Sequence, residues 1–198
     1  MKKDILEKAI FFLKKGELVA YPTDTLYGIG ADVYNLEAVK KVFLVKKRPM
    51  NMPLSVAVSN IEELNDIGFI DKKSRILANR FLPGPLCLVV KKRKIVPDII
   101  TSKSKKIAIR IPDNKTALKL VEKFGPITCT SANIHGESTP ENIKKIRMKF
   151  KDKIALYIDE GELFSEPSTI VDTTFDKIKF IREGSLSKKE IMDAIKNG

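Results

Sequence analysis

The chain has 198 residues, 43% of them hydrophobic and 31% charged, and its 37 Lys and Arg against 25 Asp and Glu give a net charge of +12. This composition suits one globular domain and excludes a collagen, a fibre, a disulfide scaffold and a wholly disordered chain. The charge predicts affinity for polyanions, namely nucleic acid, nucleotide phosphates or an acidic membrane surface, although lysines that only solvate the surface explain it equally well.

Helical periodicity and capping residues predict seven helices, over residues 4–15, 36–46, 59–66, 71–81, 113–124, 139–150 and from 187 onward. Gly16 ends the first of them. The expected N-terminal caps of later helices are Asn35, Ser59 (with Glu62), Asp113, Thr139 (followed by Pro140) and Ser187 (with Glu190).

Short apolar runs between these helices predict strands, over residues 17–21, 54–58, 86–91, 106–111, 127–130, 154–158, 169–172 and 178–181. Several helices are separated by more than one strand, so we expect a mixed sheet. The fold class is therefore α/β (α+β), a twisted mixed sheet with flanking helices in one domain over residues 1–198. The phosphate-loop and dinucleotide-binding glycine motifs do not occur.

The cysteine and histidine content argues against a structural metal site. Cys87 and Cys129 lie in apolar runs, and His135 is the single histidine. A structural zinc site needs about four such ligands, so we expect buried, reduced thiols and no protein-bound metal. The N-terminus does not open a secretory signal, and no run approaches the ~18 apolar residues of a spanning helix. These features predict a cytoplasmic protein with no membrane segment.

Polar residues follow the first expected strand and the second expected helix. Residues 22–30 carry two threonines, an aspartate and two glycines at a strand end, where α/β sheets bind ligands, although an ordinary self-capped turn has the same composition. Lys46 and Arg48 end a helix ahead of Pro49. The pair can clamp phosphates, or it can simply compensate the helix dipole.

Three later segments have the same double interpretation. Ser131 and Asn133 share one side of an extended chain and suit a nucleotide, or they form a Ser/Asn turn. Arg110 shares a strand face with Ala108 and needs an anion there, either a substrate carboxylate or an Asp or Glu. Arg182 ends a strand and can close over phosphates, or pair with Glu183 or Asp172 at the surface.

Taken together, these segments resemble a known family. Pro-Thr-Asp-Thr-x-Tyr-Gly-x-Gly, Lys-x-Arg-Pro, Ile-Arg-Ile-Pro, Thr-Ser-Ala-Asn, Pro-Ser-Thr-Ile-Val-Asp and Ile-Arg-Glu-Gly occur in the order found in YrdC-like proteins, over residues 5–184. The resemblance implies an L-threonylcarbamoyladenylate synthase with a basic concave face. Such an enzyme makes threonylcarbamoyl-AMP and pyrophosphate from L-threonine, bicarbonate and ATP, with Mg²⁺ accompanying the ATP and no tightly bound organic cofactor.

The resemblance also implies roles for particular residues. Lys46 and Arg48 match the catalytic pair that grips the ATP phosphates. The further implied ATP contacts are Ser131, Asn133, Thr139 and Arg182. The implied L-threonine contacts are Thr23, Arg110 and Ser168. The product would pass to a separate transferase that modifies position 37 of tRNA.

Two rival functions remain open at this stage. One is a carbamoyl-adenylating domain of the hydrogenase-maturation kind, which uses carbamoyl phosphate but carries acylphosphatase and zinc-finger modules for which 198 residues leave no room. The other is a protein that binds tRNA or double-stranded RNA without catalysis. The chain has no Trp and four Tyr, and its ten Phe are expected mostly in the core, so base-stacking side chains are not obvious. Weak RNA binding alongside catalysis also fits.

Overall fold

Two hydrogen-bonded β-sheets form the centre of the computed structural model, which describes residues 3–198. A four-stranded sheet has the order β8-β2-β1-β9, and a larger sheet has the order β11-β10-β5-β6-β3-β7, with β4 paired to β5. The strands are β1 (Val19–Tyr21), β2 (Gly28–Gly30), β3 (Ser55–Ala57), β4 (Gly68–Phe69), β5 (Leu86–Lys92), β6 (Lys106–Arg110), β7 (Ile127–Thr128), β8 (Thr130–Ser131), β9 (Leu156–Tyr157), β10 (Thr169–Asp172) and β11 (Lys179–Arg182).

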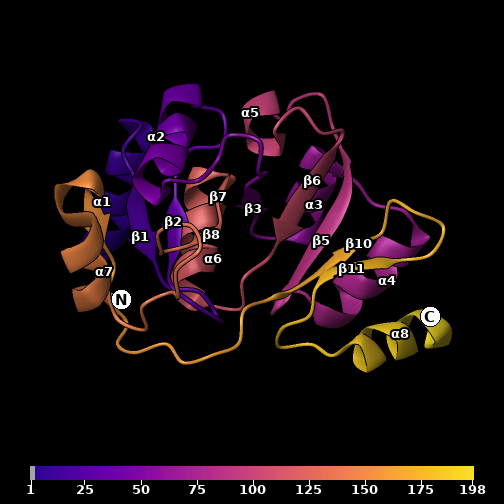
Figure 1. Cartoon of the computed structure of the whole chain (residues 1–198). Helices are drawn as coiled ribbons and strands as arrows, with labels where there is room; N and C mark the ends of the chain where they lie inside the picture. Colours follow the sequence, from indigo (N-terminus) through magenta and orange to yellow (C-terminus); the bar gives the residue numbers. More distant parts are fainter. Residues whose placement is uncertain (1–2) are drawn as a thin grey trace.

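Helices cover the outside of both sheets. They are α1 (Lys3–Lys14), α2 (Leu36–Lys46), α3 (Ile61–Ile67), α4 (Lys72–Phe81), α5 (Asp98–Thr101), α6 (Lys115–Phe124), α7 (Ile143–Phe150) and α8 (Lys188–Asn197). Figure 1 shows α1 and α7 at one end of the molecule and α4 and α8 near the other. Within the described residues, none of these helices combines the length and the apolarity that crossing a bilayer requires.

The predicted mixed α/β class is confirmed, but the single sheet is wrong. β5 runs parallel to β10 and antiparallel to β6, so the larger sheet is mixed. The expected strand over residues 127–130 divides at Cys129: Thr128 pairs with β3, whereas Thr130 pairs with β2. The chain changes sheets there because Thr128 also bonds to the first sheet, its hydroxyl donating to Ile29 O at 2.9 Å.

Three predicted helix caps are correct and three are displaced. Asn35 accepts from two backbone N–H groups of α2, the Ser187–Glu190 capping box is formed, and Gly16 follows α1 with φ 71°. In place of Ser59, Asp113 and Thr139, the caps of α3, α6 and α7 are asparagines one to three residues further on: Asn60, Asn114 and Asn142. Asparagine is a stronger N-cap than the threonine at 139, but it is no stronger than serine or aspartate, so at Ser59 and Asp113 the point where the chain enters the helix decides.

A long irregular segment joins β9 to β10, and therefore one sheet to the other. In Figure 1 this orange segment runs along the lower side of the molecule, from the end that holds α7 toward the strands of the larger sheet. Its last residues, Pro167 and Ser168, lead directly into β10. The segment is mostly exposed, but Ser168 is buried, so its end contributes to the interior between the two sheets.

Candidate functional site

One pocket of about 540 Å³ lies between the two sheets. The turn between β1 and β2 and strand β8 line it from the first sheet, and β3, β5, β6, β10 and β11 line it from the second. Eight of the nine residues predicted from the sequence lie on its wall: Thr23, Arg48, Arg110, Ser131, Asn133, Thr139, Ser168 and Arg182. The size and the mixture of polar groups are those of a small-molecule site.

Arg110 forms the deep end of this pocket. It is 5% exposed, and Ala108 shares its face of β6 as predicted, whereas Ile109 and Ile111 belong to the core. Its guanidinium pairs with Asp24 and donates to Thr25 Oγ1 at 3.2 Å. The Nε–H of Arg110 and Oδ2 of Asp24 have no hydrogen-bond partner among the described residues. An anion and an ammonium group are the ligands that would satisfy them.

Asp24 and Arg110 perturb one another in a largely dry environment. Burial raises the pKa of the Asp24 carboxyl, and the Arg110 charge opposes that rise. Burial alone would lower the pKa of Arg110, but nearby Cys129 and Asp24 outweigh it and the pKa is raised. The arginine is therefore a fixed positive charge, and only one of the carboxylate's two oxygens is used by the pair.

Thr23 organises the turn that faces Arg110. Its hydroxyl donates to Leu26 O at 2.7 Å and accepts from Thr25 N and Leu26 N, both at 3.2 Å. The side chain of Thr23 therefore caps its own turn, as in an ordinary self-capped turn. The residue also lines the pocket. Thr25, which we did not single out from the sequence, is the threonine that contacts Arg110.

Lys46 is the predicted residue that does not line the pocket. Its side chain is 1% exposed, and its Nζ donates to Ser131 O, to Asn133 O at 2.8 Å and to Asn133 Oδ1 at 3.1 Å. Burial, and secondarily the charge of Arg48, lower the pKa of Lys46 to about 7. The amino group of Lys46 therefore lies on the core side of the pocket wall, where it binds oxygen atoms of the Ser131–Asn133 segment.

The side chains of Ser131 and Asn133 continue this network toward the pocket. Ser131 Oγ donates to Asn133 Oδ1 at 2.5 Å, and Asn133 Nδ2 donates to Ile134 O and to Glu137 O. Both residues line the pocket. The segment after them, which includes Thr139, forms a loop rather than the predicted helix start, so Thr139 faces the pocket instead of capping α7.

Arg48 and Arg182 form the cationic rim of the pocket. Arg48 is anchored by Nε to Met52 O at 3.1 Å and by Nη2 to Pro53 O at 2.8 Å. Arg182 donates to Ser168 O through Nε at 3.1 Å and Nη2 at 2.8 Å, and neither Glu183 nor Asp172 pairs with it. Partial burial lowers the pKa of each arginine. Backbone carbonyls thus aim both guanidinium groups without neutralising them.

Acidic side chains are scarce around the pocket. Glu137 is the only acid on its described wall, and it forms an ion pair with Lys149. The described residues contain no group of three or more His, Cys, Asp and Glu side chains suited to a metal ion. The site is consequently a positive pocket, and Glu137 and Ser165 are lining residues that had no signal in the sequence.

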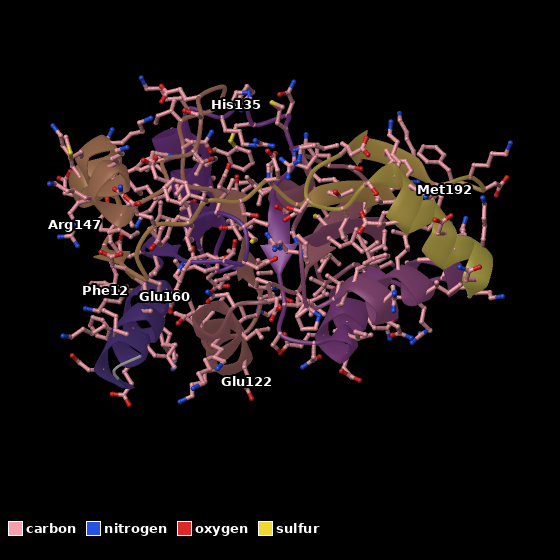
Figure 2. The ribbon with its side chains drawn as sticks, turned by 90° about the horizontal axis from the view of Figure 1, so that it is seen from below. Phe12, Glu122, His135, Arg147, Glu160 and Met192 are labelled. Atoms are coloured by element: carbon pink, nitrogen blue, oxygen red, sulfur yellow. The ribbon has the colours of Figure 1, made fainter. Side chains whose placement is uncertain are left out.

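The remaining sequence candidates lie where expected or outside the site. Cys87 and Cys129 are free and buried, and both line the pocket. Burial raises the pKa of the Cys87 thiol to about 12, so it stays protonated at neutral pH. His135 is exposed, and Figure 2 shows it at the periphery of the molecule. The burial of both thiols agrees with the expectation from the sequence.

This fold and pocket define a small-molecule-binding α/β protein with a cationic site between two sheets. The family model that matches residues 12–184 is that of Sua5, YciO and YrdC, described as telomere recombination. The chain belongs to this family.

Named relatives cover nearly all of the chain. It is 39% identical over 183 residues to a putative threonylcarbamoyl-AMP synthase of Methanocaldococcus jannaschii, over 90% of this chain and 86% of the relative. It is 38% identical to the threonylcarbamoyl-AMP synthase of Pyrococcus abyssi, over 93% of this chain and 55% of the relative. It therefore spans about half the length of that longer protein.

A solved structure agrees with the fold. The crystal structure of P. abyssi Sua5 complexed with L-threonine has a TM-score of 0.91 and 37% sequence identity, over 96% of this chain and 57% of the other. The likeness places the fold of this chain within the same architecture.

Proposed function

We propose that this protein is an L-threonylcarbamoyladenylate synthase, which converts L-threonine, bicarbonate and ATP into threonylcarbamoyl-AMP and pyrophosphate. The observation that carries the proposal is the convergence on one pocket of seven residues from six separated motifs, together with Thr139. The naming of relatives up to 39% identical supports the same activity.

The two ends of the pocket suit the two larger substrates. Arg110 is buried and keeps one N–H unpaired, so we assign it the carboxylate of L-threonine, with Thr23 and Ser168 beside it. Arg48 and Arg182 lie at the rim, where a triphosphate chain can enter, and we assign them the ATP phosphates. Ser131, Asn133 and Thr139 are then left for the nucleotide.

The reaction needs positioning more than proton transfer. The neutral amine of threonine adds to carbon dioxide with loss of a proton, or to bicarbonate with loss of water, to form a carbamate. A carbamate oxygen then displaces pyrophosphate at the α-phosphorus. Holding the carboxylate at Arg110 and the phosphates at the rim brings the two reactants together. Arg48 and Arg182 neutralise charge on the phosphates as pyrophosphate leaves. We assign Lys46 a positioning role, because its Nζ is saturated by protein oxygens.

Magnesium fits this arrangement as a companion of ATP. Mg²⁺ retains several waters and is commonly held by substrate phosphates with only one or two carboxylates. The ion would neutralise phosphate charge, and Glu137 is the pocket carboxylate within the described residues that could approach it. We further propose that the product passes to a separate transferase acting on tRNA.

Pyrophosphate release from ATP, with Mg²⁺ and bicarbonate, tests this proposal with and without L-threonine. We expect threonine-dependent release and a product with the mass of threonylcarbamoyl-AMP. Turnover with carbamoyl phosphate instead of threonine would favour the carbamoyl-adenylating alternative. Tight, salt-sensitive RNA binding with no turnover would favour a binding protein.

Arg110→Ala provides the residue-level test of substrate assignment. We expect the KM for L-threonine to rise at least tenfold while the KM for ATP changes little, because the substrate carboxylate loses its charged partner. Arg93→Ala, which removes an arginine outside the pocket, is the control. An unchanged KM for threonine in Arg110→Ala would contradict the assignment.

A further inference from the structure

A second concave surface lies outside the pocket, at the far end of strands β5 and β6. It is a groove of about 600 Å³ that we call the basic groove. Six of its nine lining residues are Lys or Arg and two are Phe, the full set being Phe69, Lys91, Lys92, Arg93, Lys94, Lys105, Lys106, Thr174 and Phe175. It shares no lining residue with the pocket.

Strand register places the groove on the same sheet face as the pocket. Phe69 pairs with Lys91, and Lys91 pairs with Lys106, so the three side chains form a row across β4, β5 and β6. Cys87 of the pocket precedes Lys91 by four residues in β5 and therefore faces the same way. At the usual strand rise this separates the two sites by about 13 Å.

Both phenylalanines of the groove are accessible, contrary to the expectation that the Phe side chains are mostly buried. Phe69 is 51% and Phe175 is 48% exposed. The guanidinium of Arg93 lies 4.3 Å from the Phe69 ring centroid, and Lys106 Nζ lies 3.8 Å from that of Phe175. The sequence does not reveal this cluster, because Phe69 and Phe175 are 106 positions apart. They come together at the basic β5–β6 hairpin only in the folded protein.

Several lysines of the basic groove have no acidic partner. Asp172 and Asp98 are the acids that form ion pairs here, with Lys106 and Lys92 respectively. The side chains of Lys91, Lys94 and Lys105 are exposed and make no hydrogen bond or ion pair with any residue that the structure describes. Three unpaired lysines around two exposed rings suit an anionic partner that also has flat apolar faces.

We propose that the basic groove binds single-stranded RNA, with unpaired bases stacked on Phe69 and Phe175 and phosphates held by Lys91, Lys94 and Lys105. Unpaired bases stack on aromatic rings and on arginine planes, whereas a duplex buries its base faces. An acidic peptide would use the lysines but not the rings. Entry into an acyl layer would carry into it the cation that lies over one face of each ring, which a lipid surface disfavours.

Fluorescence anisotropy with a labelled oligouridylate of about twelve nucleotides tests the groove, a length within the range of single-strand sites. We expect Phe69→Ala/Phe175→Ala to weaken binding about tenfold or more. The matched control is Phe11→Ala/Phe164→Ala, which removes two exposed Phe rings elsewhere. Phe69→Leu/Phe175→Leu, which keeps apolar volume, should weaken binding similarly while its thermal unfolding stays at the wild-type midpoint.

Charge is tested separately from stacking. Lys91→Ala/Lys94→Ala/Lys105→Ala should reduce the salt dependence of binding more than Lys115→Ala/Lys119→Ala/Lys123→Ala, which removes equal charge from exposed positions on α6. Threonine-dependent pyrophosphate release should be unchanged in all these variants, so failure of the groove and of the catalytic proposal are distinguishable.

Four results would overturn the proposal. Equal weakening by the groove and α6 lysine variants would mean that net charge alone binds RNA. Undiminished binding by both Phe variants would exclude stacking, and a preference for a blunt duplex of equal length would exclude the single-strand mode. Binding of polyglutamate or of phosphatidylserine vesicles, in place of the oligonucleotide, would identify another occupant.

Discussion

Single side chains in this protein differ most in how their charges are satisfied. Arg48 and Arg182 are aimed by backbone carbonyls and keep donors free for a ligand, whereas Lys46 gives its Nζ to three protein oxygens. Lys46 and Arg48, two positions apart in the sequence, therefore have different roles. Lys46 supports the wall of the pocket, and Arg48 faces the space where a ligand would bind.

Arg48→Ala should lower threonine-dependent pyrophosphate release by about a hundredfold, in line with the loss of other groups that stabilise developing negative charge. The adjacent Lys47→Ala, whose side chain is exposed, is the control and should retain activity. Steady-state assay of both variants decides the matter. Near-normal turnover in Arg48→Ala would remove Arg48 from the reaction.

Lys46 should make the stability of the protein depend on pH. Its folded pKa of about 7 lies below the ordinary value of 10.5, so between these values the unfolded chain binds more protons. The contribution of Lys46 to the free energy of unfolding is then lowest below pH 7 and rises toward pH 10. Urea titration at pH 6.5, 8 and 9.5 should show that Lys46→Met loses this rise, while Lys47→Met keeps it. If the free energy of unfolding changed with pH in the same way in the wild type and in Lys46→Met, this prediction would be contradicted.

At the scale of elements, the ends of helices were the least certain part of the sequence interpretation. Polar residues often stand in a row, as Ser59 does before Asn60 and Asp113 before Asn114, and either can cap. Which one does so depends on where the preceding strand releases the chain. For α7, the choice of Asn142 frees Thr139 to line the pocket.

Asn142→Ala should therefore destabilise the protein by about 1 kcal/mol, because the cap's bond to Lys145 N at 3.0 Å is lost. Thr139→Ala should leave the free energy of unfolding within about 0.5 kcal/mol of wild type but raise the KM for ATP. Urea unfolding and steady-state kinetics of the pair test this. A loss of stability in Thr139→Ala with none in Asn142→Ala would show that Thr139, and not Asn142, caps α7.

At the scale of the molecule, the pocket exists because two sheets meet at one bent strand. Thr128 is fully buried, and its hydroxyl bonds twice to the segment of β2, donating to Ile29 O at 2.9 Å and accepting from Ala31 N at 3.0 Å. Its backbone pairs with β3 in the other sheet. The side chain thus fixes the sheets against one another where the pocket walls face each other.

Thr128→Val keeps the shape but leaves two buried polar groups with lost partners, so the free energy of unfolding should fall by about 1–3 kcal/mol. Because the pocket spans both sheets, the KM values for threonine and ATP should rise together. Thr101→Val, also fully buried but with a 3.4 Å hydroxyl contact inside its own helix, is the control. A Thr128→Val protein of wild-type stability would show that the hydroxyl of Thr128 does not hold the two sheets together.

The sequence by itself determined the mixed α/β class, most helices and the residues of the candidate site, because periodicity, capping residues and ordered motifs are local properties of the chain. It did not determine that the expected strand 127–130 divides at Cys129, that Lys46 lies behind the pocket wall, or that Phe69 and Phe175 share an exposed groove. Those outcomes depend on which distant segments pack together. Burial and hydrogen-bond satisfaction of a side chain are settled by neighbours far away in sequence, and only the tertiary structure supplies them.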